Sequence, residues 1–280
     1  MKRYLLLKNA RIANTSEKSL CDSDILIRQR SEQSPSEIVA IGNDVSMPSG
    51  SDVMIQTVNL HSQIVCPSFI DMRCDICEPG NRNREDFESL GKAAAFGGFG
   101  SVLSIPIRGI SASDSMILDY IKQNETRTDG VNILPSVPIT SDSSASKLSD
   151  IVALSESGAV AFYDDGLADT PTLMRAMEIC AQNGLLVIAH CEEKTLVGDG
   201  VMNAGAMSKM LGFSPISACA EEIAIARNLL LAAETECRLH ITHISTARSA
   251  EMIRAAKASG IRSSGSPSKD FKSSASSSFL

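Results

Sequence analysis

The sequence predicts an α/β protein whose main part is a TIM-type (β/α) barrel, incomplete with about six of its eight βα units, preceded by a small β-rich domain. Three observations lead to this fold class. Residues 1–63 alternate short apolar runs with polar turns, residues 64–260 repeat a strand, a loop and a helix, and residues 261–280 lose apolar periodicity. We divide the chain at these boundaries.

The first 63 residues contain four short apolar runs: "RYLLLKNARI", "SDILIRQ", "EIVAIGND" and "VMIQTVNLHSQIV". Polar residues separate them at the spacing of turns, which is typical of antiparallel strands. We therefore expect a β-rich segment that forms part of a small composite sandwich.

Residues 64–260 alternate two kinds of pattern. The predicted strands are short apolar runs at 64–74, 101–107, 131–139, 159–165, 185–193 and 238–246. The predicted helices lie between and after them, at 84–98, 114–124, 145–157, 171–183, 221–236 and 247–260. Strands that alternate with helices form parallel sheets through right-handed crossovers, and a barrel is their closed form.

The barrel pattern ends before eight units are complete, since a full barrel takes about 250 residues. Residues 261–280, "IRSSGSPSKDFKSSASSSFL", are rich in serine and show no seventh strand. We expect them to be a disordered tail. Open sheet edges favour association, so we also expect a homo-oligomer or a bound partner subunit.

Charge and composition limit the functions that the chain can have. Its formal net charge is −7, which argues against nucleic acid or an anionic membrane surface as a partner. The N-terminus, "MKRYLLLKNARIAN", is interrupted by charged residues before a signal sequence could form. No apolar run reaches the roughly 18–20 residues of a membrane span, so we expect a cytoplasmic protein.

The chain has eight cysteines at irregular spacings, which we interpret as reduced thiols. Cys74 and Cys77 form a C-x-x-C pair. That pair could be a redox centre or half of a zinc site, but no second pair follows it. We favour the interpretation that most of the cysteines fill the core.

Polar residues at the predicted strand ends are the candidates for chemistry, because barrel sites form there. They are Arg73, Asp75 and Glu78, then Asp164 and Asp165, His190, and finally His240 and His243. Histidines and a carboxylate that converge from separate strands could hold zinc or a similar divalent ion. His240 and His243 are three residues apart, so a regular strand would direct only one of them into the barrel.

Several motifs resemble successive landmarks of the dihydroorotase family, in order and at similar spacing. They are "VCPSFIDMRCDICEPG", "AVAFYDDG", "VIAHCEE", "GVMNAGAMSKMLG" with "AEEIAIARN", and "LHITHISTARSAEMIRAAKASGI". Allantoinase, hydantoinase and dihydropyrimidinase share the same skeleton. The resemblance implies a barrel, a flanking β-rich domain, and hydrolysis of a cyclic amide in pyrimidine biosynthesis.

The resemblance also implies a set of metal ligands. The family's acidic ligand on strand four falls on Asp165, and its histidine ligands on strands five and six fall on His190 and His243. In the family these residues hold zinc, which lowers the pKa of a bound water for attack on the ring amide.

Other family positions are altered in this chain. Where the family has His-x-His on strand one, this chain has Arg73 and Asp75, and an arginine cannot ligate a metal. The family's substrate-binding arginine falls on Cys77, and the asparagine after strand two falls on Ile107. Its catalytic aspartate lies on strand eight, beyond the strands read here.

These alterations favour a dihydroorotase homologue that does not catalyse. The family includes non-catalytic members that support the assembly of aspartate transcarbamoylase, so this is the partner that the resemblance implies. One alternative is a weakly active hydrolase of dihydroorotate or a related cyclic amide, with Asp75 as a substitute zinc ligand. Another is a gene product truncated by a frameshift. The retained acid and histidines could also persist only as hydrogen-bonding partners, with Arg73 neutralising an acid nearby.

Overall fold

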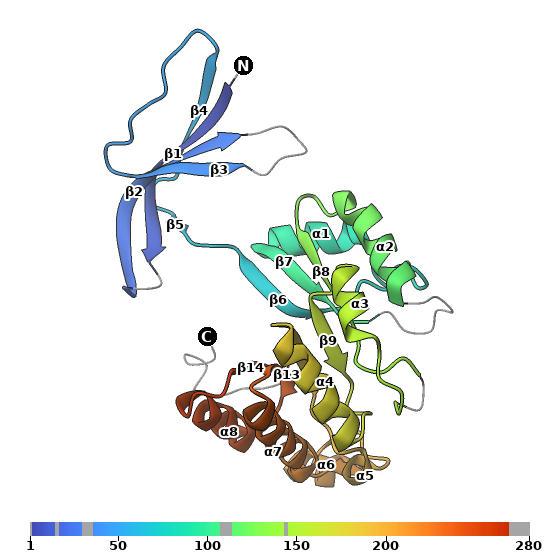
Figure 1. Cartoon of the computed structure of the whole chain (residues 1–280). Helices are drawn as coiled ribbons and strands as arrows, with labels where there is room; N and C mark the ends of the chain where they lie inside the picture. Colours follow the sequence, from blue (N-terminus) through green and yellow to red (C-terminus); the bar gives the residue numbers. More distant parts are fainter. Residues whose placement is uncertain (1, 15–16, 30–35, 107–113, 143–144, 269–280) are drawn as a thin grey trace. The chain divides into compact units, whose positions relative to one another are not determined.

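The computed structural model describes residues 2–14, 17–29, 36–106, 114–142 and 145–268. The chain divides into two compact units, Met1–Ser68 and Phe69–Leu280 (Figure 1). Each unit has its own core.

The first unit is a β-sheet, as its sequence predicts. Its strands are β1 (Lys2–Asn14), β2 (Ser19–Gln29), β3 (Glu37–Gly42), β4 (Val53–Asn59) and β5 (Ile64–Val65). The order is β3-β2-β1-β4, with β5 also paired to β1. The pairs β1–β2 and β2–β3 are antiparallel as expected, whereas β4 and β5 run parallel to β1, a departure from the predicted antiparallel strands. Tyr4, Leu6 and Leu26 form the buried centre.

The second unit is a nearly closed parallel barrel of seven strands, which confirms the predicted fold class. The strands are β6 (Phe69–Cys74), β7 (Phe99–Ser104), β8 (Asn132–Pro138), β9 (Ala161–Asp164), β10 (Leu186–His190), β13 (Arg238–Ile244) and β14 (Ser263–Pro267). Their order in the sheet is β14-β13-β10-β9-β8-β7-β6, and every neighbouring pair is parallel.

A helix follows each of the first six strands, as predicted. These helices are α1 (Phe87–Phe96), α2 (Asp114–Asn124), α3 (Ile151–Glu156), α4 (Thr170–Gln182), α7 (Ala218–Thr235) and α8 (Ala247–Ala258) (Figure 1). Short elements fill the connections: η1 (Glu125–Arg127), α5 (Lys194–Val197), β11 (Met202–Asn203), α6 (Ala206–Leu211) and β12 (Pro215–Ile216). No helix in the described part of the chain is both long and apolar enough to cross a membrane.

Alternation along the strands sorts side chains into two layers. On β10, Val187 and Ala189 pack into the large core beneath the helices. Ile188, between them, belongs instead to a cluster with Leu103 and Tyr163 on the opposite face of the sheet. The opposite face is therefore the inside of the barrel, and polar residues at the strand ends follow the same alternation.

Side-chain caps fix where the helices start after the strand-end loops. The Asp169 carboxylate accepts a hydrogen bond from the Thr172 amide at 2.8 Å and begins α4. The Asp150 carboxylate caps α3, which is why the helix predicted from residue 145 begins only at Ile151. Thr246 caps α8 directly after the end of β13.

The structure corrects the prediction for residues 261–280. Ser263–Pro267 form β14, paired in parallel with β13 from Leu239↔Ser263 to Ile244↔Pro267. Its apolar content is too low for periodicity to reveal it, and it forms because β13 offers backbone groups along an open edge. Gly265 allows a close approach, since a Cβ there would lie 2.4 Å from Ile244 Cδ1. The expected disordered tail is wrong for residues 263–267, and residues 269–280 lie outside the described residues.

Candidate functional site

Arg73, at the end of β6, is linked to the end of β9 by a tyrosine. The Arg73 Nε donates to the Tyr163 hydroxyl at 3.4 Å, and that hydroxyl lies 3.4 Å from Asp165 Oδ1, to which it donates. Burial raises the pKa of Tyr163, so it stays a neutral bridge between a cation and a carboxylate. Sequence reasoning missed Tyr163, although its position two residues before Asp165 on a strand places both on one face.

The two predicted histidine ligands do come together. The ring centroids of His190, on β10, and His243, on β13, lie 5.1 Å apart with the planes at 75°. His190 Nε2 is 3.8 Å from Glu192 Oε2, another residue that sequence reasoning had not selected. Burial lowers the pKa of His190, while the carboxylates of Glu192 and Asp165 oppose the shift. The neutral imidazole is therefore favoured.

The expectation that only one of His240 and His243 can face the barrel interior is wrong. His240 pairs with Ile188, an inward residue, and its ring nitrogens contact Ser264 Oγ at 2.8 Å and Ser266 Oγ at 3.3 Å. Regular alternation would turn His243 outward. Its φ of +60° and the register shift after Ile241 break the alternation, so its ring reaches His190.

As they lie, these residues do not fit a bound metal ion. Within the described ranges no three or more His, Cys, Asp or Glu side chains are grouped so that they could hold one. Arg73 supplies the physical reason, because its fixed positive charge is directed through Tyr163 at the predicted ligand Asp165. Asp165, His190 and His243 therefore lie near one another, but they are not arranged as the ligands of a metal ion.

The predicted substitute ligand Asp75 is engaged locally. Its Oδ1 accepts a hydrogen bond from the Cys77 amide at 3.2 Å, and its Oδ2 lies 3.9 Å from Arg84 Nη1. The Cys77 side chain is buried, with a φ of +57°, so it cannot offer the charged fork of the arginine that the family has there. Ile107, the other altered substrate position, lies outside the described residues.

The C-x-x-C pair carries no sign of reactivity. Burial raises the pKa of Cys74 to about 12 and also raises the pKa of Cys77. A reactive cysteine needs a lowered pKa, because the thiolate is the nucleophile and the metal ligand. All eight cysteines are free thiols.

Glu78, another strand-end candidate, has a structural role. It is fully buried and accepts hydrogen bonds from the Tyr120 hydroxyl at 2.7 Å and Arg127 Nη1 at 2.8 Å. Burial opposes its ionisation, but the bonds from Arg127, Tyr120 and the Phe87 amide outweigh it and lower the pKa of the carboxyl. Glu78 therefore joins α1, α2 and η1 to the end of β6.

Asp164, the neighbour of Asp165, points away from the site. It is buried, its Oδ1 accepts from the amides of Leu167 and Ala168, and burial raises its pKa. Gly166 follows with a φ of +71°, and a Cβ there would lie 2.9 Å from the His190 carbonyl oxygen. The "DDG" motif thus packs the loop after β9 onto the end of β10.

The remaining motifs hold the strand-end loops to α7. Both carboxylate oxygens of Glu221 accept a bond from the Ser245 amide at 3.0 Å, and Oε1 also accepts one from Thr246. The Asn228 amide group lies 3.2 Å from Cys191 Sγ. The "AEEIAIARN" segment therefore positions the loops that carry His190 and His243.

A parallel α/β barrel whose polar residues gather at the strand ends is a TIM-type barrel, the class of fold whose functional sites form at that end. Comparison with known proteins narrows this class. The family described as Dihydro-orotase-like matches residues 62–249. The chain belongs to this dihydroorotase-like family.

Individual relatives agree with this assignment. The chain is 40% identical over 209 residues to a dihydroorotase of Pelotomaculum thermopropionicum, covering 74% of this chain and 49% of the relative. It is 36% identical over 260 residues to a dihydroorotase of Geobacter metallireducens, covering 92% and 59% respectively. The chain thus spans about half the length of the relatives it matches.

Among solved structures, the fold is similar to that of the L-hydantoinase (dihydropyrimidinase) from Arthrobacter aurescens. The TM-score is 0.71 at 21% identity, covering 94% of this chain and 58% of that one. The dihydropyrimidinase from Brevibacillus agri NCHU1002 gives a TM-score of 0.70 at 20% identity, covering 95% and 57%. At these identities the likeness concerns the fold alone.

Proposed function

We propose that the chain is a dihydroorotase-like cyclic amidohydrolase homologue of pyrimidine biosynthesis that does not catalyse and serves as a structural partner of aspartate transcarbamoylase. The observation that carries the proposal is the link from Arg73 through the Tyr163 hydroxyl to Asp165. A guanidinium stands where the family's strand-one ligand is expected. Its fixed positive charge, linked to Asp165 through the Tyr163 hydroxyl, opposes the binding of a second cation there.

A second change supports the loss of catalysis. The position of the family's substrate-binding arginine is taken by Cys77, which is buried and carries no charge. Arginine binds carboxylates through two parallel hydrogen bonds. A ring substrate that carries a carboxylate would lose this contact at Cys77.

Surface features support a protein partner. Four large apolar side chains are exposed on and after α6: Met207, Met210, Leu211 and Phe213. Grouped exposed apolar side chains are typical of interaction sites. The net charge of −7 and the free thiols fit a protein partner in the cytoplasm, with association of identical chains as the competing mode.

Three measurements on the full chain test the proposal. We expect substoichiometric zinc by elemental analysis and no ring opening of dihydroorotate above the uncatalysed rate. Co-purification with aspartate transcarbamoylase should be lost in a Met210→Asp variant and kept in Leu230→Asp, an equally exposed control on α7. One tightly held zinc per chain together with turnover would overturn the proposal.

One observation favours a second candidate, a weak metal-dependent hydrolase of dihydroorotate or a related cyclic amide. His190 Nδ1 is buried and has no hydrogen-bond partner among the described residues, which is the state of a nitrogen awaiting a ligand. A zinc titration that raises the melting temperature of the chain, and fails to do so in His190→Gln, would favour this candidate.

A further inference from the structure

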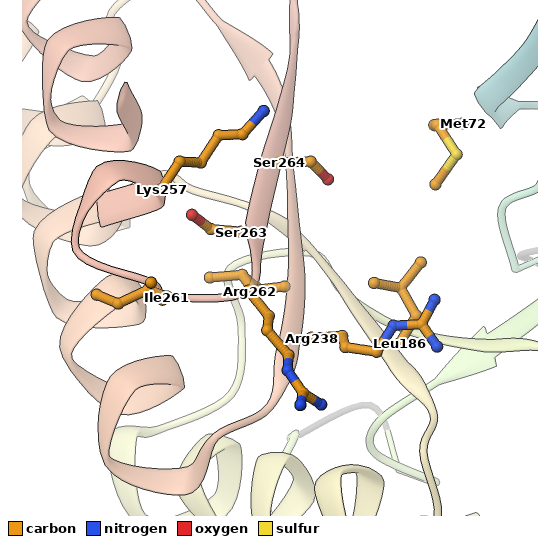
Figure 2. A pocket seen from close by; sticks show the side chains of 10 residues that line it. Met72, Leu186, Arg238, Lys257, Ile261, Arg262, Ser263 and Ser264 are labelled. Atoms are coloured by element: carbon orange, nitrogen blue, oxygen red, sulfur yellow. The ribbon is translucent and has the colours of Figure 1, made fainter. Parts of the chain in front are cut away.

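The cavity of about 590 Å³ beside the first residues of β10, β13 and β14 is lined by three cationic side chains, Arg238, Lys257 and Arg262. Figure 2 shows that their head groups point in different directions. They do not converge on one ligand group, so this cavity does not define a binding site. The helix layer carries a more regular feature, on α7.

The outer face of α7 is apolar, although it is exposed. Residues recur on it at spacings of four and three, which is the repeat of a coiled-coil seam. Leu230 is 72% exposed and Ile223 is 51% exposed, so no described element covers this face. We call the five residues at these positions the α7 seam: Cys219, Ile223, Ala226, Leu230 and Ala233.

The opposite face of α7 packs into the core of the barrel unit, through residues such as Ala224, Ile225 and Leu229. On its two sides the helix contacts α4 and α8 (Figure 1). The seam is the face that these contacts leave uncovered. A helix that is apolar on both faces is normally buried, so we expect another chain to cover the seam.

The neighbouring helices surround the seam with charge. Arg175 on α4 pairs with Glu178 at 2.7 Å, and α8 exposes Arg248 and Glu251. An apolar centre inside a charged rim is typical of protein–protein interfaces. A rim that carries both signs can also meet a copy of itself without net repulsion.

We propose that the α7 seam binds the α7 seam of a second copy of this chain, with the two helices antiparallel about a two-fold axis. The seam alternates the large side chains of Ile223 and Leu230 with the small ones of Cys219, Ala226 and Ala233. An antiparallel pairing places Leu230 opposite the second copy's Ala226. The same register places Ile223 opposite the second copy's Ala233. Each large side chain then fills the space beside a small one, and the two-fold axis uses every contact twice.

This dimer contact is separate from the exposed apolar side chains on and after α6, which the proposed function assigns to a different partner. A pair of variants therefore distinguishes the two proposals. Leu230→Asp should abolish the dimer and keep the other partner, whereas Met210→Asp should keep the dimer and lose the other partner.

Sedimentation velocity of the full chain at several concentrations tests the dimer, and we expect reversible association of two copies. Leu230→Asp should raise the dimer dissociation constant at least about a hundredfold, because it buries an unpaired carboxylate. Met210→Asp is the matched control, since Met210 is 70% exposed on α6. A chain that stays monomeric at every concentration, or a dimer unaffected by Leu230→Asp, would overturn the proposal.

A mixing experiment tests the antiparallel register. Ala226→Lys and Leu230→Asp should each dimerise poorly alone, and melting curves check that each variant folds. An equimolar mixture should recover the dimer, because the introduced ammonium of one copy then meets the introduced carboxylate of the other. A mixture that stays monomeric would refute the pairing of Ala226 with Leu230.

Discussion

After β6, the buried carboxylate of Glu78 keeps its charge because Arg127 and Tyr120 donate to it. At the ends of β9, β10 and β13, burial instead favours neutral forms. It raises the pKa of Asp164 and lowers the pKa of His190 and His240. Two regions of one barrel thus treat a buried carboxylate in opposite ways, since the pKa of Glu78 is lowered and that of Asp164 is raised.

The region after β6, here called the first side, holds the family positions that are altered in this chain. The ends of β9, β10 and β13, the second side, hold the retained positions. Arg73, Asp75 and Cys77 lie on the first side, after β6, where Arg84 approaches the carboxylate of Asp75 and Arg127 that of Glu78. His190 and His243 lie on the second side, where uncharged imidazoles pack against each other.

The largest expected effect comes from removing the charge after β6. Glu78→Ala removes a buried carboxylate that accepts hydrogen bonds from Arg127, Tyr120 and the Phe87 amide, and we expect the loss of all three to lower the free energy of unfolding by about 3–5 kcal/mol. Chemical denaturation measures this. Glu88→Ala is the matched control, because its exposed carboxylate lies 3.5 Å from the same arginine and should cost under about 1 kcal/mol. Similar losses in both variants would contradict the comparison.

On the second side, the free energy of unfolding should depend on pH through His240 of β13. Burial lowers the pKa of His240 from 6.5 to about 4, so the unfolded chain takes up a proton in this range before the folded chain does. Stability due to neutral His240 is complete above pH 6.5 and decreases by about 3 kcal/mol as the pH falls to about 4.

Urea denaturation at several pH values tests this effect. The decrease between pH 6.5 and 4 should be smaller by that amount in His240→Gln than in the unaltered chain. His61→Gln, an exposed change in the first unit, should retain the full decrease. An identical pH profile for the unaltered chain and His240→Gln would show that His240 does not titrate as its burial requires.

Converting the first side toward the family pattern should affect metal binding. In the double variant Arg73→His, Asp75→His, the guanidinium is removed and two imidazoles are added, so zinc affinity should rise at least about tenfold. Competition with a chromogenic chelator measures it. Lys92→His adds an imidazole to the surface of α1 and should not change the affinity. A double variant with unchanged affinity would mean that Arg73 is not what keeps zinc out.

The smallest effects compare the two tyrosine hydroxyls. Tyr163→Phe removes two contacts of 3.4 Å and should cost under about 1 kcal/mol of unfolding free energy. Tyr120→Phe removes a 2.7 Å bond to a charged carboxylate and should cost about 1.5–3 kcal/mol. Thermal melts of both variants show which substitution destabilises the chain more. A larger loss in Tyr163→Phe would contradict the stronger stabilisation by the charged carboxylate after β6.

Much of the barrel could be predicted because its signals are local. The strand β10 is an apolar run up to His190, and the helices between strands show apolar periodicity and begin at side-chain caps such as Asp169. The strand β14 gave no such signal, since Ser263–Pro267 contains no large apolar residue. Its structure depends on hydrogen bonds to β13, a partner distant from it in sequence until the barrel forms.

The sequence by itself determined the α/β class, the six strand–helix units and the candidate residues Asp165, His190 and His243, because periodicity and motifs are written in consecutive residues. Only the tertiary structure decided how these residues relate. The positive φ at His243 turns its ring toward His190, and the curvature of the barrel brings Arg73 of β6 to Tyr163 of β9. Contacts of this kind join residues up to 90 positions apart, so no local pattern encodes them.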